Sequence, residues 1–284
     1  MVERLLDRQF VGRWQLFIFS VKSRLFRLQV LQTTKSWNFL LDSLAAFIAL
    51  SIGISVLGDA KSLYVIAEHH TAQFDAWNIE TLGQTPPITY QATYNLSHAG
   101  DPAGVTVDND SATLFITSEG DQGVELVDAT TMTSLGWAPG ASNLGGIDID
   151  DRNDVIYTVK RGTGDIYVYD WDPATKTLTL RAGYPKILPN CGAAFGLALD
   201  ENRGLLYVAD TGNGVVRVYD VATLSEVSNF APSFPPVGIA IDRKRGFVYT
   251  TAPDGTCAGG TPTGNTLLSK YDLATGVETT VDMG

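Results

Sequence analysis

The chain has 284 residues, of which 44% are hydrophobic and 18% are charged. This composition excludes a mainly disordered chain, because disordered chains combine low hydrophobicity with high net charge. The net charge of −11 is spread unevenly: residues 1–60 carry seven Lys or Arg against four Asp or Glu, and residues 61–284 carry 13 against 27. So acidic a body argues against a nucleic-acid partner, since phosphate contacts need clustered cations.

Residues 1–37 form a basic leader in which Arg and Lys alternate with Leu, Phe and Trp. Two interpretations remain open for it. It is either an amphipathic cytoplasmic segment or a stretch upstream of the true start that is not translated, and we favour the second.

Residues 38–60 have the pattern of a secretory signal peptide. A 14-residue apolar stretch, 44–57, follows the basic residue Lys35 and precedes the small residues Gly58 and Ala60. This order of regions predicts export and cleavage after Ala60. A membrane-spanning helix needs about 20 apolar residues, so retention of 44–57 as an anchor is the second interpretation. The prediction is an extracellular, cell-surface or periplasmic protein, with no membrane contact of the mature domain unless 44–57 stays as an anchor.

Residues 61–284 contain internal repeats, which are the first signal to seek for repeat architectures. Four segments share a glycine, alternating apolar residues and an aspartate, at spacings of 42, 50 and 42 residues. Each is followed by a run with an aromatic residue, and then by an alternating run that ends in a second aspartate. The segments are Gly104–Asp108, Gly146–Asp150, Gly196–Asp200 and Gly238–Asp242; the aromatic residues are Phe115, Tyr157, Tyr207 and Tyr249; the second aspartates are Asp128, Asp170, Asp220 and Asp272.

Each repeat predicts three short strands and a weaker fourth, such as 177–181 or 226–230. Four short strands in about 40–45 residues are typical of a propeller blade. The sequence therefore predicts an all-β chain, a β-propeller of four-stranded blades. Five blades are visible, and we expect the first to lack its inner strand because the matching positions fall in the signal segment. The predicted blades are 61–100, 101–142, 143–192, 193–234 and 235–284.

The aspartates of the repeats are expected to be structural. Asp128, Asp220 and Asp272 are each followed three residues later by a threonine. A short side-chain acceptor that bonds the backbone two or three residues ahead tightens a turn. We extend this interpretation to the aspartates that end the four glycine-initiated segments.

The repeat pattern resembles the YVTN/NHL-like family of β-propeller repeats over residues 61–284. The stretch most similar to that family is Leu206–Asp220, with the sequence LYVADTGNGVVRVYD. The resemblance implies a propeller of six or seven blades, so that the five visible ones are a truncated ring. It is specific for the fold and unspecific for function, because such propellers include surface proteins, scaffolds, lactonases and lyases.

Antiparallel strand order predicts which loops share a face of the propeller. Loops from the second to the third strand lie on the same face as the crossovers to the next blade, which we name the top face. Binding residues on repeat scaffolds favour such loops, because the strands are committed to packing. The candidate binding residues on the top face are His69, His70, His98, Asp101, Glu119, Asn143, Lys160 and Asp210.

No metal and no cofactor is expected at these residues. Three histidines could ligate a transition metal, but His69 and His70 are adjacent, and adjacent side chains of an extended segment point oppositely. The histidines are therefore interpreted as solvated loop residues. No GxSxG, HExxH, P-loop or dinucleotide-binding motif is present in the sequence.

The two cysteines, Cys191 and Cys257, are a candidate disulfide. Export places both in an oxidising compartment, and they fall in top-face loops of neighbouring blades. The α-carbons of a bridged pair must lie within about 7 Å, which flexible loops need not satisfy. A bridged and a reduced pair remain equal alternatives.

The sequence favours an exported, non-catalytic β-propeller that acts as a binding or cell-surface interaction module, with a protein or glycan ligand at the top face. The alternative is a propeller-type hydrolase or lyase, similar to a lactonase, with its site on the same face. Such an enzyme needs acids or a central metal from several inner strands, and the residues ahead of two of those strands, Ala194 and Pro236, are apolar.

Overall fold

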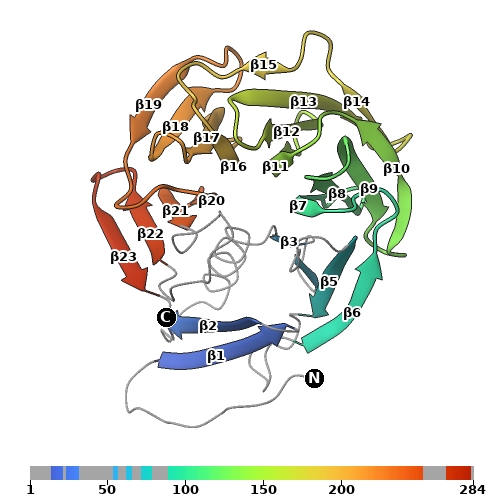
Figure 1. Cartoon of the computed structure of the whole chain (residues 1–284), viewed down its shortest axis with the longest axis horizontal. Helices are drawn as coiled ribbons and strands as arrows, with labels where there is room; N and C mark the ends of the chain where they lie inside the picture. The colour runs from blue at the N-terminus through green and yellow to red at the C-terminus, as the bar shows by residue number, and fades with distance from the viewer. Residues whose placement is uncertain are drawn as a thin grey trace.

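The computed structural model describes residues 14–21, 24–31, 54–56, 62–65, 72–78, 89–251 and 267–282. All regular elements in these ranges are β-strands, and five antiparallel sheets follow one another in chain order around a ring (Figure 1). This confirms the predicted all-β propeller of four-stranded blades. Among the described residues no helix is long and apolar enough to cross a membrane.

The first three sheets run from the inside of the ring outwards. The first contains β3 (Ile54–Val56), β4 (Ser62–Val65), β5 (Gln73–Asn78) and β6 (Thr89–Asn95). The second contains β7 (Pro102–Asp108), β8 (Thr113–Ser118), β9 (Gly123–Asp128) and β10 (Thr133–Pro139). The third contains β11 (Leu144–Asp150), β12 (Val155–Lys160), β13 (Asp165–Asp172) and β14 (Thr177–Leu180), and the short β15 (Lys186–Ile187) also pairs with β13.

The last two sheets repeat this order. The fourth contains β16 (Ala194–Asp200), β17 (Leu205–Asp210), β18 (Val215–Asp220) and β19 (Glu226–Phe230). The fifth contains β20 (Gly238–Asp242), β21 (Phe247–Thr251), β22 (Leu267–Asp272) and β23 (Glu278–Asp282). The four glycine-initiated segments thus lie in the inner strands, as the repeat predicted. They form the last five residues of β7, β11 and β16 and the whole of β20.

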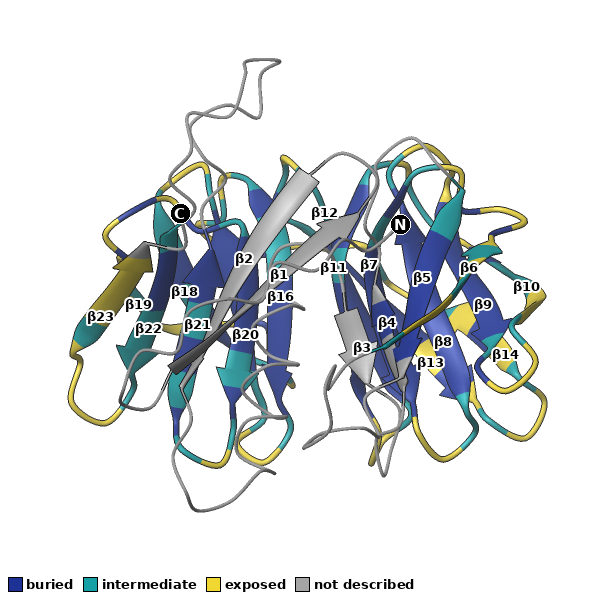
Figure 2. Cartoon of the chain, turned by 90° about the horizontal axis from the view of Figure 1, so that it is seen from below, coloured by how far each residue is buried: buried dark blue, intermediate teal, exposed yellow. Residues whose placement is uncertain are grey.

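The core lies between the sheets. Alternate residues of a strand point to opposite faces, so each sheet packs against both neighbours. Leu206 and Val208 of β17 face the third sheet, and Tyr207 and Ala209 face the fifth. Most described residues of the inner and middle strands are therefore buried or half-buried, whereas turns and fourth strands such as β23 are largely exposed (Figure 2).

The two predicted sets of turn aspartates are confirmed as structural. Asp200 Oδ1 accepts hydrogen bonds from the backbone N–H of Asn202 and Arg203, and Asp220 Oδ1 accepts one from Thr223 at 2.8 Å. In the third sheet β13 continues two residues further, so Asp172 takes this role with Thr175, and Asp170 instead pairs with Arg181.

The prediction that the first sheet lacks its inner strand is wrong. β3 pairs antiparallel with β4, with Ile54 opposite Val65 and Val56 opposite Leu63. The strand was missed because it lies inside the apolar stretch 44–57, whose composition points to a signal peptide. Signal cleavage itself stays a prediction, and cleavage after Ala60 would remove β3.

A two-stranded hairpin, β1 (Trp14–Val21) and β2 (Arg24–Leu31), belongs to the predicted leader. It is drawn across the wedge between the first and fifth sheets (Figure 1). Within the described residues its strands pair with each other and with no blade. The number of blades in a complete ring stays a prediction.

Candidate functional site

The top face is confirmed as the meeting place of the second-to-third strand loops and the crossovers. Arg161, after β12, donates its N–H to the carbonyl of Asn143, in the crossover before β11. Gly162 donates its N–H to the carbonyl of Ala194, the first residue of β16. The loop after β12 is therefore joined both to the crossover into its own sheet and to the inner strand of the following sheet.

Five top-face residues from three sheets converge, and we name them the rim: Asp101, Glu119, Asn143, Arg161 and Phe195. Glu119 donates its N–H to the Asp101 carbonyl at 2.7 Å, and Asn143 donates its N–H to the Glu119 carbonyl at 2.9 Å. The Asn143 side-chain amide donates to the Arg161 carbonyl at 3.1 Å. The sequence predicted Asp101, Glu119 and Asn143, and the structure places them together.

Arg161 and Phe195 complete the rim. The guanidinium of Arg161 lies 4.7 Å from the centre of the Phe195 ring and forms an ion pair with Glu119. Its side chain is 20% exposed and that of Glu119 is 18% exposed, so the pair is partly shielded from solvent. Contacts of this kind are stronger where water is partly excluded. The rim thus combines one cationic group, two carboxylates, one amide and one aromatic ring.

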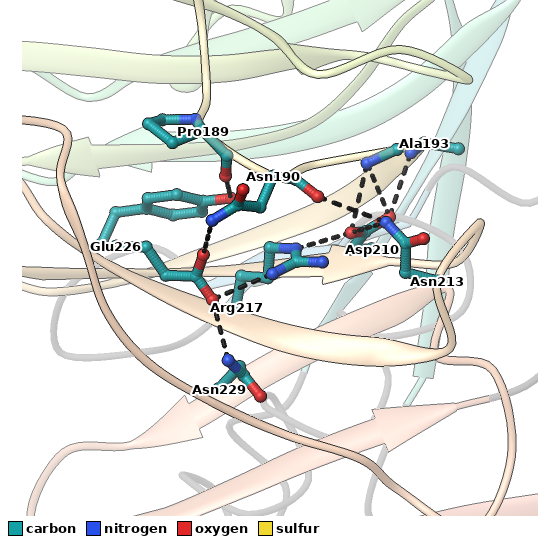
Figure 3. A network of polar contacts seen from close by, with 10 residues as sticks. Pro189, Asn190, Ala193, Asp210, Asn213, Arg217, Glu226 and Asn229 are labelled. Carbon is teal, nitrogen blue, oxygen red and sulfur yellow. Dashed lines mark hydrogen bonds and ion pairs between the residues drawn. The ribbon is translucent and has the colours of Figure 1, made fainter.

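Asp210 has a structural role in this face. Its buried carboxylate accepts hydrogen bonds from the N–H of Gly192 and Ala193, from the Asn213 amide and from the Arg217 guanidinium (Figure 3). Burial alone would raise the pKa of Asp210, but the bonds from Asn213, Ala193 and Arg217 together hold it below its ordinary value. Asp210 therefore anchors the crossover from the third to the fourth sheet.

Glu125 does the same for the crossover from the first to the second sheet, and the sequence did not predict it. Its fully buried carboxylate accepts the N–H groups of Ser97, His98 and Ala99, each at 2.8 Å. His98 is exposed, and its ring lies 5.7 Å from that of Trp137. The only sequence signal for Glu125 is a charged residue in the middle of the apolar run VELVD.

The remaining predicted residues are distributed as follows. Lys160 is half-buried at the end of β12, beside the rim residue Arg161. His69, His70 and Cys257 lie outside the described residues, so their roles and the disulfide stay predictions. Cys191 is half-buried in the crossover held by Asp210, and burial raises the pKa of its thiol to about 12.

A second polar cluster lies at the opposite face, among the turns after the inner strands. Asp148 accepts the N–H of Leu199 at 2.8 Å, and Arg243 donates to the Leu199 carbonyl at 2.8 Å and pairs with Glu201 at 2.5 Å. The third, fourth and fifth sheets are thereby tied together, which is a structural role. In the described part of the chain no group of three or more His, Cys, Asp or Glu could hold a metal ion.

Comparison with solved structures agrees with this architecture. No protein-family model and no curated protein sequence matches the chain. A crystal structure of a nidogen/laminin complex matches with a TM-score of 0.63 and 18% identity, over 95% of this chain and 93% of that chain. A protein from Lactobacillus plantarum matches with a TM-score of 0.59 and 16% identity, over 81% of this chain and 70% of that chain.

Hydrazine synthase from Kuenenia stuttgartiensis matches similarly, with a TM-score of 0.59 and 13% identity, over 82% of this chain and 66% of that chain. At such identities these likenesses show the fold alone. Together with the ring of antiparallel sheets they show that the chain is a β-propeller.

Proposed function

We propose that this propeller is an exported, non-catalytic binding module with YVTN/NHL-like repeats, whose rim receives a protein or glycan ligand. The observation that carries the proposal is the convergence of Glu119, Asn143, Arg161 and Phe195 from three sheets on one half-buried patch. A few polar groups beside an aromatic ring are what ligand sites on pre-formed scaffolds offer.

The non-catalytic part of the proposal is supported by how the carboxylates are used. General acid–base chemistry needs a carboxyl group free to exchange a proton with substrate. Asp210 and Glu125 are instead buried and hold crossover loops, and Glu119 is paired with Arg161. The structure of a protein complex among the similar folds, that of nidogen with laminin, is compatible with a binding role.

The test measures binding and turnover on the same exported protein. The protein is collected outside the cells of a secreting host and applied to arrays of glycans and extracellular proteins. We expect a ligand whose binding falls about tenfold or more in Arg161→Gln, since a shielded charge contact is worth about 1–3 kcal/mol. Lys244→Gln, on an exposed turn of the opposite face, is the matched control and should leave binding unchanged.

Two results would overturn the proposal. Hydrolysis of lactone substrates by the wild-type protein would favour the enzyme alternative. Equal ligand binding by wild type and Arg161→Gln, with both variants folded, would move the site away from the rim.

A further inference from the structure

The sequence contains two Asn-X-Ser/Thr motifs, the acceptor pattern for N-linked glycosylation of exported proteins. They are Asn95–Ser97, with the sequence NLS, and Asn109–Ser111, with the sequence NDS. The first spans the end of β6 and the start of the crossover to the second sheet, and the second lies in the turn after β7. Their surroundings differ, and the difference favours the first as an acceptor.

The first motif presents its asparagine and its serine to solvent. Leu96 between them is 8% exposed and packs in the core shared with the second sheet, and it donates its N–H to the Ala72 carbonyl at 2.7 Å. Because alternate residues of an extended backbone point to opposite sides, this burial turns Asn95 and Ser97 outwards, and both are exposed. Asn95 Oδ1 accepts a hydrogen bond from Gln73 Nε2 at 2.8 Å. Within the described part of the chain Asn95 Nδ2, the atom that takes a sugar, has no hydrogen bond.

The second motif is held inside a tight turn. The Ser111 hydroxyl donates to the Asp108 carboxylate, which also accepts the N–H of Asp110 at 2.9 Å. Asp108 is 4% exposed and is fixed by the indole N–H of Trp171, which it accepts at 2.8 Å. The hydroxyl of this motif is therefore engaged in the turn. Asn109 thus provides a comparison within the same chain.

The strand that ends at Asn95 is an outer edge without charge. β6 is the last strand of its sheet, so one side of it has no partner among the described strands. It has seven residues, as β10 has, and is longer than β14, β19 and β23. Charged residues and proline are two features that protect an edge against pairing with another chain. β6 contains neither, whereas β10 ends in Pro139 and both β19 and β23 contain acidic residues.

We propose that Asn95 is a site of N-linked glycosylation and that its glycan covers the outer edge of β6. The proposal rests on the proposed function, because the chain meets the glycosyl transferase only on export. It does not depend on cleavage after Ala60, since a chain anchored by residues 44–57 presents the same domain. A bulky, solubilising group at the last residue of the strand hinders another strand from pairing along it.

The donor is an oligosaccharide linked to a lipid through pyrophosphate. Asn95 Nδ2 forms the new bond, to the anomeric carbon of the first sugar. The bond between that carbon and the pyrophosphate oxygen breaks, and its electron pair leaves with the lipid pyrophosphate. The amide nitrogen gives up one proton, so that no oxidant or reductant is needed.

The experiment expresses the full chain in a eukaryotic secreting host and collects the protein outside the cells. Peptide N-glycosidase removes N-linked glycans and converts each linked asparagine to aspartate, so peptide mapping by mass spectrometry identifies the modified position. The variants are Asn95→Gln, Ser97→Ala and, as the matched control, Asn109→Gln. Ser97→Ala leaves Asn95 in place and keeps the backbone N–H at position 97 that donates to Glu125.

We expect a single glycan on the wild type, at Asn95. It should be lost in Asn95→Gln and in Ser97→Ala and kept in Asn109→Gln. Light scattering should show a glycosylated wild type that is monomeric, whereas Asn95→Gln should associate at protein concentrations at least about tenfold lower.

Four results would overturn the proposal or part of it. An exported protein without glycan removes the modification and leaves export and the rim intact. A glycan that persists in Asn95→Gln places the acceptor elsewhere. Equal association of wild type and Asn95→Gln removes the role of the glycan at the edge of β6. A protein that stays inside the cells unmodified contradicts export, and the inference fails with it.

Discussion

Glycine at the start of an inner strand determines how closely neighbouring sheets approach. A Cβ atom on Gly196 would lie 2.6 Å from the Val237 carbonyl oxygen, and one on Gly146 would lie 2.6 Å from the Leu197 nitrogen. Both obstacles are backbone atoms of the next sheet, which cannot rotate away. The glycine of the repeat is therefore required by packing around the centre of the ring.

We expect Gly196→Ala to destabilise the protein by about 1–3 kcal/mol, because it overpacks a junction between two backbones. The measurement is the free energy of unfolding by chemical denaturation. Gly120→Ala is the matched control: its Cβ would lie 3.4 Å from Asp101 Cβ, an ordinary contact, so little change is expected. Equal effects of the two substitutions would show that backbone entropy, not packing, explains the glycine.

The second residue-scale prediction concerns Asp210. Asp210→Ala leaves the N–H groups of Gly192 and Ala193 and the guanidinium of Arg217 without their acceptor, at a cost of about 3–5 kcal/mol. Because hydrogen bonds hold the pKa of Asp210 below its ordinary value, its contribution is present at neutral pH and is lost as pH falls below about 4.

Denaturation curves at pH 7 and pH 3 check this. The difference in unfolding free energy between wild type and Asp210→Ala should shrink at the lower pH. Asp165→Ala, a half-exposed carboxylate that accepts a bond from the Thr163 hydroxyl, is the control and should cost far less. A difference that is the same at both pH values would show that the carboxylate charge does not contribute.

At the scale of elements, the repeats made the inner, second and third strands predictable. Glycine, alternating apolar residues and aspartate recur at near-constant spacing. A strand predicted in one repeat is therefore supported by the matching segments of the other repeats. β3 was not predictable in this way, because Ile54–Val56 lies in an apolar stretch with no glycine–aspartate pattern of its own.

The contacts that hold the crossovers could not be predicted from the repeats. Glu125 holds one crossover and Asp210 another, from different strands, while Glu278 of β23 accepts bonds from Ser233 in a third. In the second, fourth and fifth sheets the crossover is thus held by a different residue at a different position. Of the rim, Asp101, Glu119 and Asn143 were predicted from loop topology, whereas Phe195 was not, because it lies within a strand.

A pH-dependent effect belongs to the turn between β11 and β12. Partial burial, with the nearby carboxylates of Glu201, Asp108 and Asp148, raises the pKa of Asp151 to about 7. The folded protein therefore holds this proton more tightly than the unfolded chain does. The stability that protonation gives is complete below about pH 4 and is lost as pH rises towards 7.

We expect Asp151→Asn to melt at a higher temperature than wild type at pH 8 and at the same temperature at pH 4. The gain should be modest, since Asp151 lies at the exposed surface of its turn and solvent screens its charge. Asp110→Asn, in the corresponding turn of the second sheet, is the matched control. A wild type that is more stable at pH 8 than Asp151→Asn would contradict the sign of this effect.

At the scale of the whole molecule, the ring is a row of sheets that contact their neighbours. Four hydrophobic clusters join the first sheet to the second, the second to the third, the third to the fourth and the fourth to the fifth. In repeat architectures stability is approximately a sum of such neighbour terms. Within the described residues the middle sheets take part in two clusters each, and the first and fifth in one each.

This arrangement predicts a gradient of local stability around the ring. Amide hydrogens of β12 and β17 should exchange at least about tenfold more slowly than those of β4 and β21, because terminal repeats open without disrupting a second interface. Hydrogen exchange followed by mass spectrometry measures this on the full chain. All four are second strands with one inner and one outer partner, so hydrogen bonding within the sheet is matched. Equal protection in all four would mean that the first and fifth sheets are joined across the wedge as firmly as their neighbours are, and the ring would then behave as closed.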